Sequence, residues 1–476
     1  MTTSLLQLIP LLIYLAGVLF LFLFSLSQLD LLLQYLFRKN RDQKQIQFKD
    51  ADLPAVTIQL PVYNEKEVII RLLHAVTAIQ YPAEKLEIQI LDDSMDETSA
   101  RIDEWMNEEA NGFNVKVIRR NNRAGFKAGA LQHGLEKCSG ELIAIFDADF
   151  VPPPDFLLKT VNQFNDPAVG AVQTRWGHLN EKDNALTRLQ AFGLDAHFTI
   201  EQQARHLSGV LLNFNGSAGI WRKSCIQDSG GWSADTLTED LDLSFRAQMK
   251  GWRMVYDPTV ICPAELPANL HAVIAQQQRW NKGGAESARK LAGQLWRAGL
   301  SLHAKIQGTF QLLASSIYPA LFFASVASLI LFWTDASQGQ FLNIEVWGAY
   351  AFIGFLSLIL VYGVSAFKNR QPFWWALPAF LILNMGLAFR HTKAVVTGWL
   401  GKQSPFVRTP KTGGGRGTAI WKQSGILNGT PEWLMASVYL YTTWYAIQSD
   451  QMNLVLFHGM MGLGTLCTAI FLLRDR

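Results

Sequence analysis

The chain passes from apolar to acidic within one short stretch, ELIAIFDADF, which occupies residues 141–150. The apolar part of this stretch predicts a short buried strand. Asp147 and Asp149 follow it at i, i+2 spacing, so both carboxylates can turn toward one point just past the strand end. Carboxylate oxygens suit Mg²⁺ or Mn²⁺, and Mg²⁺ is usually held by one or two carboxylates together with phosphate oxygens. We therefore predict that this pair binds a divalent metal ion, which in turn holds a diphosphate.

Neighbouring strand ends strengthen this interpretation, since alone a D-x-D pair is more typical of a solvated turn. Apolar runs predict further strands over residues 56–61, 86–91 and 115–118, with helical spacing between them. Strands that alternate with helices are typical of a parallel α/β sheet, in which ligands bind beyond the carboxyl ends of the strands. Polar side chains follow three of these predicted ends: Asn64 and Glu65, Asp92 and Asp93, and Asp147 and Asp149.

The composition separates a globular middle from apolar ends. The chain has 476 residues, of which 49% are hydrophobic and only 17% charged, against about 25% charged in average soluble domains. The net charge of +3 gives no reason to expect nucleic-acid binding. The four cysteines show no metal-binding spacing, so we expect free thiols in a reducing compartment.

Five apolar stretches are long enough to cross a bilayer. They lie at residues 5–36, 310–333, 346–367, 431–447 and 454–473. Basic residues follow the first stretch at once, which places the N-terminus outside and residue 40 onward in the cytoplasm. We therefore expect a multi-pass protein of the cell (inner) membrane with three parts: an N-terminal transmembrane helix (1–40), a cytoplasmic domain with interfacial helices (50–300) and a C-terminal transmembrane region (305–476).

A sixth apolar stretch, residues 373–389, is short, contains Pro378 and has basic residues on both sides. As a span it would carry a cluster of lysines and arginines to the outside. We predict instead a helix lying at the cytoplasmic interface, over residues 373–400.

Several residues of the middle region suit a binding or catalytic role. Asp93 can accept from a nucleobase N–H or a ribose hydroxyl, and it can also cap the following helix. Lys127, at a helix start between glycines, suits a phosphate. Asn215 and Gly216 belong to a run of small and amide residues that can form a wall for a sugar. Asp240, in Thr-Glu-Asp at a helix start, suits a general base, although such a triplet is also a common cap.

A predicted helix before the second span carries Gln276-Gln277-Gln278-Arg279-Trp280. Arg279 can form a bidentate pair with phosphate, and Trp280 offers a flat face for a pyranose ring. The same Arg-Trp pair can instead anchor the helix at the lipid boundary.

Taken in order, the motifs resemble a known family. D-D-S (92–94), D-A-D (147–149), T-E-D (238–240) and Q-Q-Q-R-W (276–280) are similar to the signature of family 2 inverting glycosyltransferases. More narrowly, the chain resembles the membrane-embedded cellulose synthase-like branch, and within it the mannan, glucomannan and xyloglucan-backbone synthases. The resemblance implies a GT-A α/β domain inserted between transmembrane helices.

The resemblance also implies a role for each matching residue. Asp93 would bind the nucleoside, Asp147 and Asp149 the metal and diphosphate, and Gln276 and Arg279 the pyrophosphate. Trp280 would stack on the acceptor sugar. Asp240, with Glu239 beside it in the same motif, would provide the catalytic base.

A further match concerns the segment 403–418. Phe406-Val407-Arg408-Thr409-Pro410-Lys411 resembles the F-x-V-T-x-K gating loop of the branch, with arginine in place of valine. Phe406, Thr409 and Lys411 would then contact the donor from the cytoplasmic side. The alternative is a basic juxtamembrane loop that touches anionic lipid. Because the chain ends directly after a span, we expect no PilZ domain and no cyclic di-GMP site on it.

The expected function is a processive, inverting β-glycosyltransferase that polymerises a polysaccharide such as a β-1,4-glucan or a mannan, and translocates it. Its partners would be a nucleotide sugar, Mg²⁺ or Mn²⁺, the growing glycan and membrane lipid. UDP-glucose and GDP-mannose both remain open as donors. The alternatives are a single-addition enzyme that glycosylates a ceramide- or polyprenyl-phosphate-type lipid and, less favoured, a transporter without chemistry.

Overall fold

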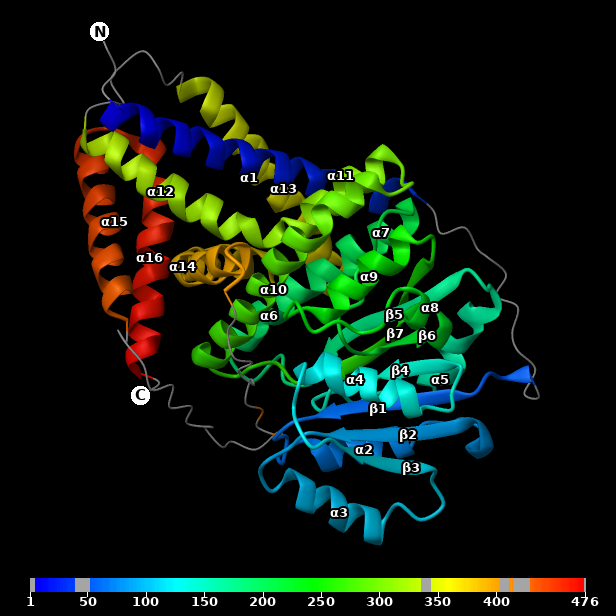
Figure 1. The fold of residues 1–476 in the computed structure, drawn as a ribbon. Helices are drawn as coiled ribbons and strands as arrows, with labels where there is room; N and C mark the ends of the chain where they lie inside the picture. The colour runs from blue at the N-terminus through cyan, green and yellow to red at the C-terminus, as the bar shows by residue number, and fades with distance from the viewer. Residues whose placement is uncertain are drawn as a thin grey trace.

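The computed structural model describes residues 5–38, 52–334, 344–402, 411, 413 and 429–474. Its described part has an α/β unit at one end and a layer of long helices at the other (Figure 1). The long helices come from both ends of the chain, while the α/β unit comes from the middle. The predicted insertion of an α/β domain between apolar helices is therefore confirmed.

A seven-stranded sheet forms the centre of the α/β unit, in the order β3-β2-β1-β4-β6-β5-β7. Its strands are β1 (Val56–Val62), β2 (Leu86–Asp92), β3 (Val115–Arg119), β4 (Leu142–Ile145), β5 (Val169–His178), β6 (Gly219–Arg222) and β7 (Arg253–Ala264). The first four, which the sequence predicted to within one residue, pair in parallel. The sheet is mixed rather than parallel throughout, because β6 runs antiparallel to both β4 and β5. Strand β6 begins with Gly219 beside Ile145, the last residue of β4, and therefore runs in the direction opposite to β4.

Helices cover both faces of the sheet. The α/β unit contains α2 (Ile69–Thr77), α3 (Thr98–Glu108), α4 (Phe126–Lys137), α5 (Phe156–Thr160), α8 (Lys223–Asp228), α9 (Glu239–Met249) and the short 3₁₀ turns Ala83–Lys85 and Val161–Asn165. Alternate side chains of one strand enter opposite cores, as strand geometry requires. Leu142 and Ala144 pack with α2 and α3, whereas Ile143 and Ile145 pack with α4 and α8.

The register of the parallel strands brings their carboxyl ends to one edge. Val62 pairs with Asp92, Asp92 pairs with Arg119, and Gln59 pairs with Ile145. Residues 63–65, 93 and 147–149 therefore all leave the sheet on the same side. This is the edge that faces the layer of long helices.

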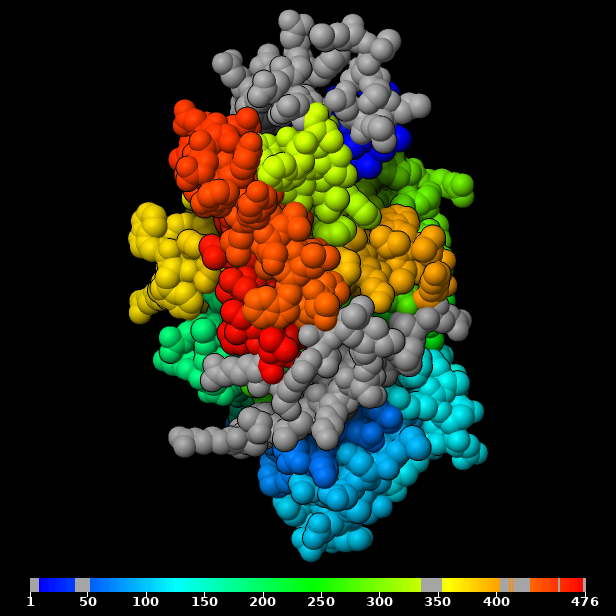
Figure 2. All heavy atoms as spheres, turned by 90° about the vertical axis from the view of Figure 1, so that its left-hand side faces the viewer, coloured from blue at the N-terminus to red at the C-terminus, as the bar shows by residue number. Residues whose placement is uncertain are grey.

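The remaining helices form that layer and its contact with the sheet. They are α1 (Leu5–Phe37), α6 (Ala185–Ala196), a π-helix (His197–Gln202), α7 (Gln203–Ser208), α10 (Leu270–Arg297), α11 (Leu302–Leu312), a 3₁₀ turn (Ala314–Ser316), α12 (Ile317–Trp333), α13 (Ile344–Asn369), α14 (Phe373–Trp399), α15 (Thr430–Gln448) and α16 (Met452–Arg474). Among the described residues, four stretches are long and apolar enough to cross a membrane: Leu8–Phe37, Ala314–Trp333, Phe373–Trp399 and Leu454–Leu473. Three of them match predicted spans, whereas 373–399 was predicted to be interfacial and the predicted spans at 346–367 and 431–447 are not among the four. The chain thus has the character of a multi-pass membrane protein, and α15 and α16 form much of the face seen in Figure 2.

Helix α14 is longer than the predicted apolar stretch. It runs unbroken for 27 residues, with Pro378 in its second turn. Figure 1 shows it nearly along its own axis, whereas α15 and α16 lie along the page, so α14 crosses them steeply. The crossing with α16 is very close, because a Cβ added to Gly386 would lie 2.2 Å from the carbonyl oxygen of Gly464.

Asp30, the acidic residue of the first span, has a structural partner. Its carboxylate pairs with His303 at 2.8 Å and accepts from the Gln307 amide at 2.6 Å. Asp30 therefore joins α1 to α11. This structural role accounts for a charged residue in the first apolar helix, so Asp30 gives no support to the transporter alternative.

Candidate active site

One cleft of about 190 Å³ lies between the carboxyl edge of the sheet and α10. It is lined by all the predicted site residues that belong to the described part of the chain: Asp93, Lys127, Asp147, Asp149, Asn215, Gly216, Glu239, Asp240, Gln276, Arg279, Trp280 and Lys411. Phe406 and Thr409 lie outside the described residues. The structure thus brings together side chains that are up to about 320 positions apart in the sequence.

The D-A-D turn presents its two carboxylates to the cleft because its other side chains are buried. Phe146, Ala148 and Phe150 are almost fully enclosed in the core. The turn is fixed by the Asp147 N–H, which donates to the Ser217 hydroxyl at 2.9 Å. Asp147 and Asp149 are both half-buried at the cleft wall.

Each carboxylate of this turn is neutralised by a lysine. The Lys127 ammonium lies 2.6 Å from Asp147 Oδ1, and the Lys411 ammonium lies 2.5 Å from Asp149 Oδ2. Lys411 is largely buried and also donates to the Glu265 carbonyl at 3.0 Å. The two carboxylates therefore attract positive charge to this part of the cleft.

The same turn fits a divalent cation of the Mg²⁺ type. In the described residues no cluster of three or more histidine, cysteine or acidic side chains is suited to enclose a metal. Two adjacent carboxylates alone are the donor set of an ion that takes its remaining ligands from phosphate and water. The chemistry of the turn therefore agrees with the predicted Mg²⁺ or Mn²⁺ held by Asp147 and Asp149.

Lys127 is placed by an unusual start to α4. Gly125 and Phe126 both have positive φ, at 72° and 49°, which turns the chain sharply into the helix. The ammonium then reaches Asp147 and the Gly216 carbonyl, with Glu239 3.7 Å away. Burial opposes its charge, but the two carboxylates outweigh burial and raise the pKa of Lys127. It stays protonated and can hold an anionic ligand.

Asp240 lies in the first turn of α9, deep in the cleft. Burial, followed by repulsion from Glu239, raises the pKa of its carboxyl to about 7. A carboxyl with a near-neutral pKa is well suited to accept a proton at physiological pH. Gly216 allows this arrangement: it has φ 81°, and an added Cβ would lie 2.9 Å from Asp240 Oδ2. The Thr238 side chain makes no capping bond, but Asp240 Oδ1 accepts from the Leu241 N–H at 2.8 Å, so the carboxylate also serves the first turn of α9.

Asp93 is held by a residue that the sequence analysis missed. Arg120, from the end of β3, donates from Nε to Asp93 Oδ1 at 2.9 Å and from Nη2 to Oδ2. The predicted cap is also wrong, because α3 begins at Thr98, whose N–H bonds to Asp96. The signal for Arg120 was its place directly after a third parallel strand.

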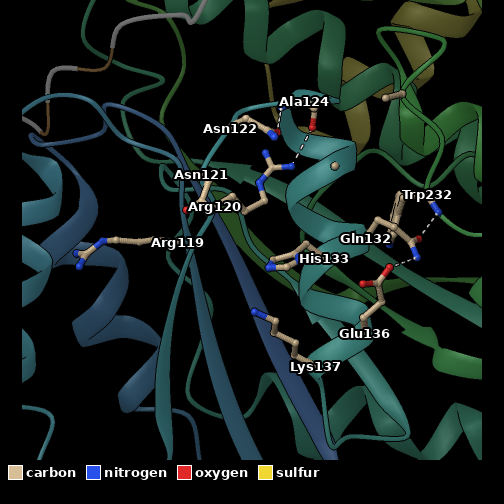
Figure 3. Close-up of a pocket in the computed structure, with 12 residues that line it drawn as sticks. Arg119, Arg120, Asn121, Asn122, Ala124, Gln132, His133, Glu136, Lys137 and Trp232 are labelled. Carbon is tan, nitrogen blue, oxygen red and sulfur yellow. Dashed lines mark hydrogen bonds between the residues drawn. The ribbon is translucent and has the colours of Figure 1, made fainter.

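A second cavity, of about 640 Å³, lies on the far side of Arg120. Figure 3 shows its lining, with Arg119 and Arg120 from the end of β3 and His133, Glu136 and Lys137 from α4. Arg120 Nη1 donates to the Ala124 carbonyl at 2.8 Å, so the guanidinium forms a wall between this cavity and Asp93. None of the predicted site residues lines it.

Tyr63 and Arg123 are two further cleft residues that the sequence analysis did not single out. The Arg123 guanidinium lies 3.1 Å from the centre of the Tyr63 ring. Together they form a flat surface near Asp93, where a planar base can pack. Their signal in the sequence was weak, since neither belongs to a recognisable motif.

Helix α10 supplies the wall opposite the sheet. Asn269 caps it by accepting from the Ala272 N–H at 2.8 Å. Gln276, Arg279 and Trp280 follow at helical spacing and all line the cleft, so the Arg-Trp pair is not merely a lipid anchor. Their neighbour Gln277 contacts α14, because its Oε1 lies 2.9 Å from His391 Nε2.

Asn215 and Gly216 form part of the wall, as predicted, but the Asn215 side chain is already engaged. Its Oδ1 accepts from Gln202 at 2.8 Å, and its Nδ2 lies 3.0 Å from His197 Nε2. Both partners belong to the π-helix, a rare element that is frequent at functional sites.

Comparison with known proteins shows the family of this chain. The model of the family "Glycosyltransferase like family 2" matches residues 54–283. The chain is 35% identical to glucomannan 4-beta-mannosyltransferase 7 of Arabidopsis thaliana over 384 residues, which is 76% of this chain and 66% of that protein. It is 34% identical to probable glucomannan 4-beta-mannosyltransferase 3 of Oryza sativa subsp. japonica, over 77% of this chain and 67% of that one. It is 32% identical to glucomannan 4-beta-mannosyltransferase 9 of Arabidopsis thaliana, over 80% of this chain and 72% of that protein. The chain spans about two thirds of the length of these relatives.

A solved structure shares the fold. A mannosyltransferase from Pyrobaculum calidifontis, in complex with GDP-Man and Mn²⁺, superposes with a TM-score of 0.57 at 20% identity, covering 84% of this chain and all of that one. The predicted GT-A fold and the predicted resemblance are thus both confirmed. The chain therefore belongs to glycosyltransferase family 2 and, within it, is similar to the glucomannan 4-β-mannosyltransferases of the cellulose synthase-like group.

Proposed function

We propose that this protein is a membrane-embedded β-mannosyltransferase that polymerises a mannan or glucomannan from GDP-mannose, with inversion at the anomeric carbon. The cleft carries the proposal, because it gathers an acidic pair, a half-buried base and the arginine and tryptophan of α10. The choice of donor rests on the relatives, whose names are those of mannosyltransferases, and on the fold neighbour's complex with GDP-mannose.

Asp240 is the residue we assign as the base. The acceptor hydroxyl gives its proton to this carboxylate and attacks the anomeric carbon, while the bond to the diphosphate breaks. Direct displacement turns an α-linked nucleotide sugar into a β-linked product. Glu239, beside it, keeps the carboxyl basic through repulsion.

The departing diphosphate carries the charge that develops during the reaction. Arg279 can hold two of its oxygens, and Lys127 can hold a third, because the ammonium already faces Asp147 at the cleft wall. Held by Asp147 and Asp149, Mg²⁺ or Mn²⁺ would supply further positive charge at the same place. Gln276 and Lys411 line the cleft beside these groups and complete the polar surface for the donor.

The acceptor end of the cleft favours a polymer. Trp280 lines the cleft from α10, a helix that packs against α14 and touches α16, so we place a bound glycan at the entrance to the apolar layer. We place the α/β domain (50–300) in the cytoplasm between the transmembrane parts 1–40 and 305–476, with α14 along the membrane surface. The bases that follow α1 and flank α14 support this orientation.

The test is a synthesis reaction in membranes that contain the protein. GDP-[¹⁴C]mannose with Mn²⁺ is expected to give an ethanol-insoluble product that endo-β-1,4-mannanase digests. Parallel reactions with UDP-[¹⁴C]glucose, with both donors together, and with EDTA measure donor choice and metal dependence. A product that consists only of a short, solvent-extractable glycolipid would identify single addition to a lipid and overturn the polymerase.

A further inference from the structure

Helix α10 contacts the cleft at one end and, further along, the loop that carries Asp240. The carboxylate of Glu286 accepts from the Leu237 N–H at 2.9 Å. The next residue, Ser287, is fully buried, and its hydroxyl lies 3.1 Å from that of Thr238. The first contact holds the backbone and the second a side chain of the segment immediately before the Glu239–Asp240 pair.

A glycine lets the helix approach this closely. A Cβ added to Gly283 would lie 2.6 Å from Thr238 Cγ2 and 2.9 Å from its backbone nitrogen. Thr238 therefore packs directly on the backbone of α10, and any side chain there would push the loop away.

A third contact holds the loop from its other side. Lys290 forms an ion pair of 2.7 Å with Asp242, which is fully buried in α9, and one of 2.8 Å with Asp235. Lys290 also belongs to α10, so the helix binds the chain both before and after Asp240.

These anchors continue the helical stripe that lines the cleft. Gln276, Trp280, Gly283, Ser287 and Lys290 follow at intervals of four, three, four and three residues, which places them on one face of α10. A single rigid helix thus presents the arginine and tryptophan to the substrates and sets the position of the base relative to them.

We propose that Glu286, Ser287 and Gly283 are positioning residues, through which α10 holds Asp240 in register with a substrate bound at Arg279 and Trp280. This inference rests on the proposed role of Asp240 as base. It assigns to α10 a second task besides contact with phosphate and sugar: it fixes the distance between the base and the acceptor.

Four variants and one matched control test the proposal. In Glu286→Ala and Ser287→Ala an anchor is lost, whereas in Glu286→Gln the oxygen that accepts from Leu237 is kept. In Gly283→Ala the loop is displaced. Gly293→Ala is the control, because Gly293 is also within α10 but an added Cβ there meets nothing within 4 Å.

The readouts are kcat and KM for nucleoside diphosphate release, GDP affinity with Mn²⁺, thermal midpoint in detergent and the pH profile of kcat. Glu286→Ala and Gly283→Ala are expected to lower kcat about 10- to 100-fold, with KM and GDP affinity within about twofold of the unmodified protein. They should also move the acidic limb of the kcat profile, which a purely structural defect would not do. Glu286→Gln should retain most of the activity, and Gly293→Ala should match the unmodified protein.

The proposal is overturned if Glu286→Ala and Gly283→Ala leave kcat unchanged, or if they weaken GDP binding and lower the thermal midpoint as much as they lower kcat. It is also overturned if Glu286→Gln is as impaired as Glu286→Ala. The donor for these assays is whichever nucleotide sugar the unmodified protein turns over. Failure of the GDP-mannose assignment is therefore seen in the unmodified protein, separately from failure of the anchors.

Discussion

The Asp240 carboxyl is desolvated and lies beside the negative charge of Glu239, so the activity of the enzyme should depend on pH. Because the pKa of its carboxyl is raised to about 7, the carboxyl is protonated below that pH and cannot accept a proton. We expect kcat to fall about tenfold for each pH unit below 7 and Asp240→Asn to lose at least about 1,000-fold at pH 8. Initial rates of GDP release between pH 5 and 9 measure both.

Whereas kcat should rise with pH, the stability of the fold should fall as pH rises. A raised pKa means that the fold favours the protonated carboxyl, so this favourable contribution is present at low pH and is lost as pH rises through about 7. The advantage of Asp240→Asn in thermal midpoint over the unmodified protein should therefore grow from pH 5 to about 7 and level off above it. A constant difference in thermal midpoint would show that Asp240 is not the group that titrates.

Lys411 occupies the position where we expect the metal to bind. Its ammonium, 2.5 Å from Asp149, must leave that carboxylate before a cation can bind there. Lys411→Ala should therefore bind Mn²⁺ about three- to tenfold more tightly in the absence of nucleotide, as expected when a competing ion pair of roughly 1 kcal/mol is removed.

Electron paramagnetic resonance of free Mn²⁺ measures this affinity directly. The control is Lys159→Ala, which removes a solvent-exposed lysine that pairs with Asp155 at 2.5 Å and does not line the cleft. Unchanged or weaker Mn²⁺ binding by Lys411→Ala would mean that the lysine does not compete with the metal.

At the scale of elements, the crossing of α14 and α16 depends on two glycines. A Cβ on Gly464 would lie 2.2 Å from the Ile382 carbonyl and 2.7 Å from the Gly386 amide nitrogen. Both are backbone atoms, so the helices must separate. We expect Gly464→Ala to cost about 1–3 kcal/mol and to lower the thermal midpoint in detergent.

Gly459→Ala, in the same helix, provides the comparison. An added Cβ there first meets Thr443 Cγ2 at 3.6 Å, an ordinary contact, so the substitution should be neutral or slightly stabilising. Equal thermal midpoints for the two variants would contradict the close crossing.

For the molecule as a whole, the orientation of α14 decides the topology. If α14 lies at the cytoplasmic surface, Gln371 and Lys402, at its two ends, lie on the same side of the membrane, and Asp450, between α15 and α16, lies on the other. Single cysteines at these positions, in a Cys467→Ser background, should react accordingly with an impermeant maleimide in sealed vesicles. The other three native cysteines are buried and should not interfere. Labelling of positions 371 and 402 from opposite sides would make α14 a span.

Local patterns were sufficient for much of this molecule. The first four strands, the helices between them and the acidic strand ends follow from runs and periods of a few residues, which depend on near neighbours alone. β5, β6 and β7 were not predicted. The antiparallel direction of β6 in particular depends on where the chain returns after α7, and no short window contains that information.

The amino-acid sequence by itself determined the family and which carboxylates to propose for the chemistry, since four spaced motifs carry both without any coordinates. Only the tertiary structure decided the partner of each side chain: Arg120 for Asp93, and Lys411 for Asp149 across 262 positions. The reason is physical. The burial of a side chain and the charges around it depend on atoms that only folding brings together. The raised pKa of Asp240 and the contacts between α10 and the loop before Asp240 therefore exist only in the folded chain.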